Sequence, residues 1–210
     1  MSAQAKRALW LRPEEYLMME RQAEYRSEYF DGDTFAMAGA SRRHNVIVSN
    51  IVRILGNQLL DRRCNVYASD MRVKIEKIRK YTYPDVVVAC DDERFEDDMR
   101  DSLLNPIVIF EVLSDSTEAY DQGEKFTHYQ AIDSLVEYIL VSQSPYSVEQ
   151  FVKQNTRIWT YYKFDQENDV LPLQAIHCEI ILEDMYKKVL QKNRTHVPPK
   201  RATPKLQTKR

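Results

Sequence analysis

Two acidic residues stand inside otherwise apolar stretches of the sequence. Asp85 precedes three consecutive valines, and Glu111 interrupts the apolar run 107–113. An ionised carboxylate within an apolar strand is costly unless a cation pairs with it or the strand end opens to solvent. If the two strands are neighbours, both carboxylates converge on one point and form an oxygen-rich site suited to Mg²⁺. The simpler alternative is that each acid pairs with a nearby arginine or caps a loop.

A third charged group follows in the segment DQGEKFTHY, residues 121–129. Asp121, Lys125 and Tyr129 are spaced at i, i+4 and i+8, so they share one face of a helix. Because this helix begins soon after the Glu111 run, it can lean back and point Lys125 at the two carboxylates. The simpler alternative is a surface salt bridge between Asp121 and Lys125, with Tyr129 in the core.

The elements that must position these residues are predicted from periodicity and end signals. Residues 13–21 begin with Pro-Glu-Glu, which is typical of a short helix. The pair Asp31-Gly32 between two apolar-containing runs predicts a β-hairpin. A long amphipathic helix is expected from Ser41, its N-cap, to about Arg63.

Strands follow in the middle of the chain. Residues 70–76 alternate between apolar and polar types, which predicts a half-buried strand with a solvated Asp70. Residues 83–90 and 106–113 are almost continuously apolar and predict the central strands, covered on both faces. The remaining expected elements are a helix at 117–132, a strand at 136–141, an antiparallel ribbon at 147–154 and 158–165, and a strand leading into a helix at 178–190.

This order predicts an α/β domain over residues 1–190. Its mixed central sheet is flanked by helices, with an N-terminal β-hairpin and a C-terminal antiparallel ribbon. The 210 residues, 43% hydrophobic and 30% charged, fit one globular domain. With four glycines the sequence has no Gly-rich phosphate loop, and it has no apolar run of membrane-spanning length. The first 16 residues have no sustained apolar core, so we do not expect them to act as a secretory signal.

Cysteine usage and charge add two expectations. Cys64, Cys90 and Cys178 are far apart and form no CxxC pair, which predicts neither a zinc site nor a disulfide and favours a reducing, cytoplasmic setting. Residues 191–210 hold seven Lys or Arg and no acid, leaving 23 basic and 32 acidic residues, or −9, in residues 1–190. The tail is predicted to be a flexible extension that either contacts phosphates or is an inert end.

Taken together, these segments resemble the Uma-two type restriction endonucleases, a branch of the PD-(D/E)XK nuclease superfamily. The resemblance covers about residues 13–190. The matching stretches are RSEYFDGD at 26–33, the histidine at position 44, YPDVVV at 83–88, PIVIFEVLSDST at 106–117, DQGEKFTHY at 121–129 and VEYILV at 136–141.

The resemblance implies a restriction-endonuclease-like fold and a metal-dependent phosphodiesterase site. Asp85 and Glu111 match the acids that hold Mg²⁺, and Glu28 matches the acid of the family's Glu-x-x-Asp-Gly segment. The superfamily lysine normally stands two residues after the second acid, where this chain has Leu113. The resemblance maps that lysine onto Lys125 instead.

Further residues are expected to support the site. His44 follows Arg42 and Arg43 at the positive end of the long helix, where a phosphate can bind. An ordinary surface histidine or a satisfied buried one is the simpler alternative for His44. Tyr129 and Asp121 share the helix face of Lys125, and Asp121 can hold its ammonium in position.

The function expected from these residues is that of a Mg²⁺-dependent DNA endonuclease. It is expected to act as a homodimer, because cleaving both strands usually needs two sites, and to have no membrane partner. One alternative is a catalytically inactive nuclease fold that binds nucleic acid or serves in assembly, a reading that the departure at Leu113 favours. Another is a hydrolase that acts on RNA.

Overall fold

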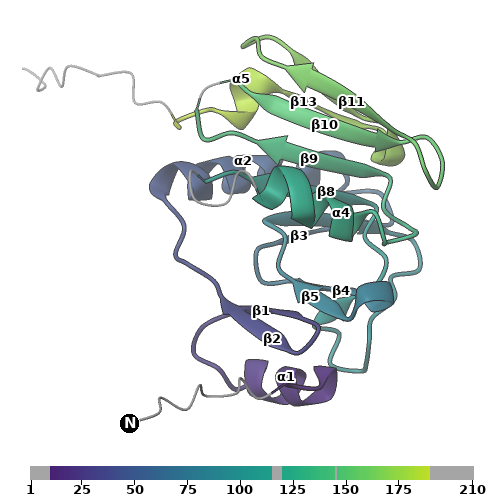
Figure 1. Cartoon of the computed structure of the whole chain (residues 1–210). Helices are drawn as coiled ribbons and strands as arrows, with labels where there is room; N and C mark the ends of the chain where they lie inside the picture. The colour runs from purple at the N-terminus through teal and green to yellow at the C-terminus, as the bar shows by residue number, and fades with distance from the viewer. Residues whose placement is uncertain (1–9, 115–119, 145, 190–210) are drawn as a thin grey trace, which may run out of the picture.

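The computed structural model describes residues 10–114, 120–144 and 146–189 (Figure 1). Two large β-sheets dominate this part of the chain, and a two-stranded sheet packs beside the larger one. In the view of Figure 1 the smaller of the two lies below the larger, with helix α1 (Pro13–Glu20) beneath it. Asp85 directly precedes strand β6 (Val86–Cys90) and Glu111 lies in strand β8 (Val108–Val112), both of the larger sheet, so the packing of the two sheets positions the site.

The lower sheet contains five strands in the order β2-β1-β5-β4-β7. Their bounds are Ser27–Phe30 for β1, Asp33–Ala36 for β2, Arg72–Ile75 for β4, Lys80–Thr82 for β5 and Ser102–Leu103 for β7. The predicted hairpin joins β1 to β2 through Asp31 and Gly32, which both have positive φ values, 44° and 103°. Asp-Gly tolerates this conformation, so the turn signal in the sequence is confirmed.

The upper sheet contains six strands in the order β11-β10-β9-β8-β6-β3. Their bounds are Cys64–Ala68 for β3, Val86–Cys90 for β6, Val108–Val112 for β8, Glu137–Val141 for β9, Val148–Lys153 for β10 and Trp159–Phe164 for β11. β8 and β9 are parallel and the other neighbours are antiparallel, so the sheet is mixed. The two strands predicted as central, β6 and β8, are neighbours, and the predicted ribbon extends the same sheet as β10 and β11.

Alternate residues of the upper sheet face two different cores, as the period of two in a strand requires. Val86 and Phe110 point toward helix α2 (Arg42–Gln58), while Val87 and Ile109 point toward the segment that holds Lys125. That segment comprises the π-helical turn η2 (Asp121–Lys125) and helix α4 (Phe126–Tyr129). The α2 side also carries β12 (Val170–Leu173), β13 (Cys178–Ile181) and α5 (Leu182–Met185), while η1 (Glu76–Ile78) and η3 (Gln174–Ile176) are short 3₁₀ turns.

Several element boundaries differ from the predicted ones. Helix α2 begins after Ser41, whose hydroxyl accepts a hydrogen bond from the His44 backbone N–H, but it ends at Gln58 because turns lead from there into β3. The predicted helix at 117–132 is present as η2 and α4, and residues 117–119 lie outside the described residues. Arg72, one of the polar residues of the predicted half-buried strand 70–76, is buried, because it binds Asp101, Ser102 and the Tyr83 hydroxyl.

The expectation of no disulfide is wrong. Cys64 and Cys90 are bonded, 26 residues apart in the sequence. They lie directly opposite each other in the antiparallel ladder between β3 and β6, and this pairing cannot be seen from their spacing. Cys178 is a free, buried thiol.

Two expectations concern the ends of the chain and the membrane. The predicted basic tail, residues 191–210, lies outside the described residues. Within the described ranges, no helix is both long and apolar enough to cross a membrane.

Candidate active site

Asp85 and Glu111 lie at the adjoining ends of β6 and β8. The antiparallel ladder pairs Val86 with Phe110, so one further step of the same register sets Asp85 opposite Glu111. The backbone N–H of Val112 donates a hydrogen bond to Asp85 Oδ2 at 2.7 Å, which ties the aspartate to the end of β8. Residues opposite each other in such a ladder point to the same face, with Cβ atoms about 5 Å apart. The two acids are therefore close neighbours at one end of one strand pair.

The Glu111 side chain is only 5% exposed and is held by two donors. The Tyr129 hydroxyl donates to Glu111 Oε1 at 2.7 Å, and Lys125 Nζ lies 2.9 Å from the same oxygen. Burial raises the pKa of Glu111 to about 8; Lys125 opposes this effect, and the nearby charges of Asp85 and Asp121 add to it. The second oxygen, Oε2, accepts no hydrogen bond from the described residues, so it is available to a ligand.

Lys125 reaches the carboxylates from η2, and it is buried rather than exposed. Its side chain is 9% exposed, and Nζ lies 2.9 Å from Glu111, 3.4 Å from Asp121 and 3.7 Å from Glu28. Burial disfavours the ammonium form, but the three carboxylates outweigh this penalty and raise the pKa of Lys125 well above its usual value. The surface salt bridge that spacing alone suggested for Asp121 and Lys125 is thus part of a larger buried cluster.

The lower sheet closes the site from the other side. Glu28 of β1 accepts a hydrogen bond from the Thr82 hydroxyl of β5, and Thr82 Oγ1 lies 3.3 Å from the Tyr129 hydroxyl. Glu28, Thr82, Tyr129 and Glu111 therefore form a continuous polar chain from one sheet to the other. Both sheets and the η2–α4 segment must pack correctly to form this cluster.

His44 joins the site through Asp85. The N-cap at Ser41 fixes the first turn of α2, and His44 Nε2 lies 3.0 Å from Asp85 Oδ1. Its other ring nitrogen, Nδ1, is buried and has no hydrogen-bond partner among the described residues. Arg42 and Arg43 are exposed at the same helix end, and the Arg42 guanidinium donates to the Lys188 carbonyl at 3.1 Å.

Two polar residues of β5 beside the site were not predicted from the sequence. Thr82 was missed because a three-residue strand gives no periodic signal. Lys80, on the same strand, is buried and its Nζ lies 2.5 Å from the Tyr120 hydroxyl and 3.1 Å from His128 Nδ1. Burial lowers the pKa of Lys80, and the charges of Glu28 and Glu111 partly compensate. Asp70, by contrast, is exposed as expected.

The residues present fit a cation held mainly by two carboxylates. Across the described ranges, no three His, Cys, Asp or Glu side chains are already arranged as a metal shell. Mg²⁺ is commonly bound through one or two carboxylates, with water and substrate phosphate completing the shell. Glu111 Oε2, which accepts no hydrogen bond from the described residues, and the nearby Asp85 fit this mode of binding, and a bound cation would favour the ionised form of Glu111 that burial disfavours.

The fold is that of a mixed α/β protein of the nuclease type, and comparison with known proteins supports that class. The model of the Uma2 family, described as "Putative restriction endonuclease", matches residues 13–183. The chain belongs to this family, so the resemblance stated from the sequence motifs is confirmed.

The relatives cover most of the chain. The uncharacterized protein sll1609 of Synechocystis sp. (strain ATCC 27184 / PCC 6803 / Kazusa) is 38% identical over 154 residues, which are 73% of this chain and 87% of that protein. The uncharacterized protein slr1290 of the same organism is 34% identical over 177 residues, 84% of this chain and 92% of that protein.

A solved structure has the same fold. The crystal structure of a "putative nuclease belonging to DUF820" from Anabaena variabilis ATCC 29413 aligns with a TM-score of 0.69 and 17% identity. The alignment covers 86% of this chain and 99% of that one. The predicted fold class, a mixed α/β architecture of the nuclease type, is therefore confirmed.

Proposed function

We propose that this protein is a divalent-metal-dependent endonuclease that hydrolyses phosphodiester bonds in DNA. The observation that carries the proposal is the contact of 2.9 Å between Lys125 Nζ and Glu111 Oε1, made beside Asp85 at the ends of two neighbouring strands. Two acids can hold a divalent metal ion, and a lysine can stabilise the charge that builds on a phosphate, so this set of side chains suits metal-assisted phosphodiester hydrolysis. The family description and the structural relative, both in nuclease terms, support the proposal.

Asp85 and Glu111 would hold the metal, with Mg²⁺ the expected ion. When bound, Mg²⁺ lowers the pKa of a coordinated water and neutralises charge on the phosphate. Tyr129 orients Glu111 by donating to Oε1, which leaves Oε2 for the metal. His44 and the Val112 N–H hold the two oxygens of Asp85 in place.

Lys125 would orient the attacking water or stabilise the negative charge that builds on the phosphate. Asp121 and Glu28 keep its ammonium near Glu111, at 3.4 Å and 3.7 Å. The exposed Arg42 and Arg43, at the N-terminus of the 17-residue helix α2, would contact a flanking phosphate. Cleavage of both strands would require a second copy of the chain, so we expect a homodimer.

A second candidate is a nuclease fold that binds nucleic acid without cleaving it. It is favoured by one observation: Leu113 stands where the superfamily's lysine is usual, and it is buried among apolar residues. In that case the Lys125 cluster would serve only to hold η2 between the two sheets. Hydrolysis of RNA in place of DNA would use the same residues.

Nicking of supercoiled plasmid DNA tests the proposal against this alternative. The wild-type protein is expected to nick DNA in Mg²⁺ and to lose that activity in EDTA, and Glu111→Gln is expected to lower the rate at least a hundredfold. Glu137→Gln is the matched control, because Glu137 is a buried glutamate of the adjacent strand β9 that binds Gln150 and the Ala175 N–H instead of the site. Equal nicking by wild type and Glu111→Gln would refute the proposal.

A further inference from the structure

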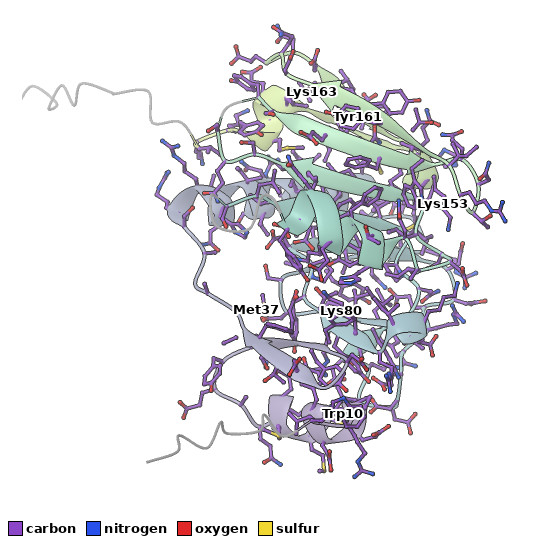
Figure 2. The ribbon with its side chains drawn as sticks, in the orientation of Figure 1. Trp10, Met37, Lys80, Lys153, Tyr161 and Lys163 are labelled. Atoms are coloured by element: carbon purple, nitrogen blue, oxygen red, sulfur yellow. A yellow bond between two sulfur atoms is a disulfide. The ribbon has the colours of Figure 1, made fainter. Side chains whose placement is uncertain are left out.

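The outermost strand of the upper sheet carries a row of aromatic and basic side chains. Trp159, Tyr161 and Lys163 are every second residue of β11, so all three lie on one face of the sheet. Lys153 of β10 lies opposite Trp159, and its Nζ is 5.9 Å from the centre of the indole ring. We refer to these four residues as the aromatic shelf; Figure 2 labels three of them, Lys153, Tyr161 and Lys163.

Strand register sets the shelf on the same sheet face as the candidate site. Glu111 of β8 is aligned with Leu140 of β9, Leu140 is opposite Glu149 of β10, and Glu149 is opposite Lys163 of β11. Three steps between neighbouring strands span about 14 Å. This distance equals about four rises of 3.4 Å along the axis of a DNA duplex, and an extended unpaired strand spans it in no more nucleotides than that. A strand whose phosphate sits at Glu111 therefore reaches Lys163 within a few nucleotides.

The helix that carries the proposed catalytic lysine is also attached to the shelf. Phe126 directly follows Lys125, and its ring centroid lies 4.4 Å from that of Phe151 and 5.4 Å from that of Trp159. The Phe151 ring in turn supports Tyr161, at 5.3 Å. These tilted and edge-on ring contacts fix the position of the shelf relative to Lys125 by packing.

The shelf offers an open aromatic face and a net positive charge, from two lysines and one glutamate. Tyr161 is 49% exposed. Lys163 is exposed and forms no ion pair with the described residues, while Lys153 donates to the neutral Asp133 carbonyl at 2.9 Å. Glu149 is the acid in this row, so two ammonium groups face one carboxylate on a chain whose residues 1–190 carry a formal charge of −9. On this acidic body, two lysines lie beside the exposed ring of Tyr161 and the partly exposed ring of Trp159.

We propose that the aromatic shelf binds an unpaired stretch of the nucleic-acid strand that leads away from the cleaved phosphate. A base stacks on Tyr161 and a phosphate contacts Lys163. The inference rests on the proposed function and narrows the substrate class to DNA with a single-stranded flank beside the cleavage point. Aromatic rings bind the π-face of any base, and only an unpaired base offers that face freely.

Binding measured by fluorescence anisotropy tests the shelf with two probes of equal length, a blunt duplex and a duplex with a single-stranded overhang, in buffer without divalent metal. We expect the wild type to prefer the overhang. Tyr161→Ala should weaken overhang binding about tenfold and leave blunt-duplex binding unchanged. Lys163→Ala should lower the slope of log K against log salt by about 0.7 to 1.

Tyr162→Ala is the matched control. Tyr162 is the next residue on the same strand, is 46% exposed and points to the opposite face of the sheet. The Tyr162→Ala variant should bind both probes as the wild type does. Equal loss in both tyrosine variants, no loss in Tyr161→Ala, or a wild type that prefers the blunt duplex would overturn the shelf.

The outcomes separate the shelf from the proposed nuclease activity. Tyr161-dependent binding without Glu111-dependent nicking would support strand binding at the shelf and refute the proposed nuclease activity. Glu111-dependent nicking with unchanged binding in Tyr161→Ala would support the proposed nuclease activity and refute strand binding at the shelf. A wild type that binds neither probe and nicks nothing would refute both.

Discussion

Lys125 Nζ lies 2.9 Å from Glu111 Oε1, although the glutamate belongs to β8 and the lysine to the π-helical turn that follows it. The position two residues after Glu111, just past the end of β8, is occupied by the buried Leu113. A cation therefore stands beside the second carboxylate without being part of the strand. π-Helical turns often occur at functional sites, and this one sets Asp121 and Lys125 side by side.

Replacing Tyr129 with phenylalanine should slow DNA nicking about tenfold to a hundredfold. The hydroxyl donates to Glu111 Oε1 at 2.7 Å, and a hydrogen bond to a charged group is worth about 1.5–3 kcal/mol. Steady-state nicking rates at saturating Mg²⁺ measure the effect. Tyr81→Phe, which removes a hydroxyl bonded to Glu96 in the lower sheet, is the control and should nick at the wild-type rate. A Tyr129→Phe variant as active as that control would contradict the orienting role.

Mg²⁺ should stabilise the wild-type fold, because a ligand that binds only the folded state adds about 2.7 kcal/mol at a hundred times its Kd. For a chain of this length, that corresponds to a rise in Tm of about 5–10 °C. Asp85→Asn should abolish the rise, since it removes a charged metal ligand and keeps the side-chain size. Asp70→Asn, at an exposed aspartate outside the site, should retain it. Scanning calorimetry with and without Mg²⁺ measures the rise in Tm. If the rise persists in Asp85→Asn, the metal binds at a site that does not include Asp85.

The candidate site residues could be predicted where the local sequence itself marked them as unusual. Asp85 and Glu111 stood out because each is a charge in an apolar run, and the spacing of Lys125 from Asp121 indicated a shared helix face. The burial of Lys125 could not be predicted in this way. It depends on the packing of η2 against Glu28 and Thr82, and these come from a second sheet whose strands are far apart in the sequence.

The second sheet was not predicted for the same reason. β5 and β7 are only three and two residues long and pair with distant strands to form a separate lower sheet. The disulfide between Cys64 and Cys90 follows from the register of β3 on β6, and β3 itself gave no clear signal. Local sequence patterns were enough to predict the long helix and the central strands. The lower sheet and the disulfide depend on pairing between strands far apart in the sequence, which such patterns do not show.

Acid should destabilise the fold in part through Asp101. Hydrogen bonds from Arg21 and the charge of the buried Arg72 hold the pKa of Asp101 well below its usual range. Because the folded-state pKa lies below the unfolded value of about 3.9, this stabilisation is complete above that pH and is lost as the pH falls through the folded-state pKa. Asp101→Asn should cost about 1.5–3 kcal/mol at pH 7 and flatten the decline in stability below pH 4. Urea denaturation from pH 7 to pH 3 measures both effects, and parallel curves for variant and wild type would contradict this assignment.

Reduction of the disulfide should lower the free energy of unfolding by about 3 kcal/mol. The bond closes a loop between residues 26 positions apart, and releasing such a loop restores conformational entropy to the unfolded chain. Urea denaturation with and without dithiothreitol measures the loss. The double variant Cys64→Ser/Cys90→Ser is the control and should show no response to the reductant. A wild-type curve that is unchanged by reductant would mean that the bridge adds no stability.

The most direct test of the account is the effect of Lys125→Met on nicking, measured together with Mg²⁺ affinity. Methionine keeps the volume of the buried side chain and removes its charge, so we predict a loss in nicking rate of at least a hundredfold, with Mg²⁺ still bound at Asp85 and Glu111. The fold should lose about 3 kcal/mol, because one partner of a buried ion pair is removed, so the assay is run where the variant remains folded. Lys74→Met, which breaks the pair with Glu96 away from the site, is the matched control and should nick as the wild type does. Nicking by Lys125→Met at the rate of that control would contradict the account.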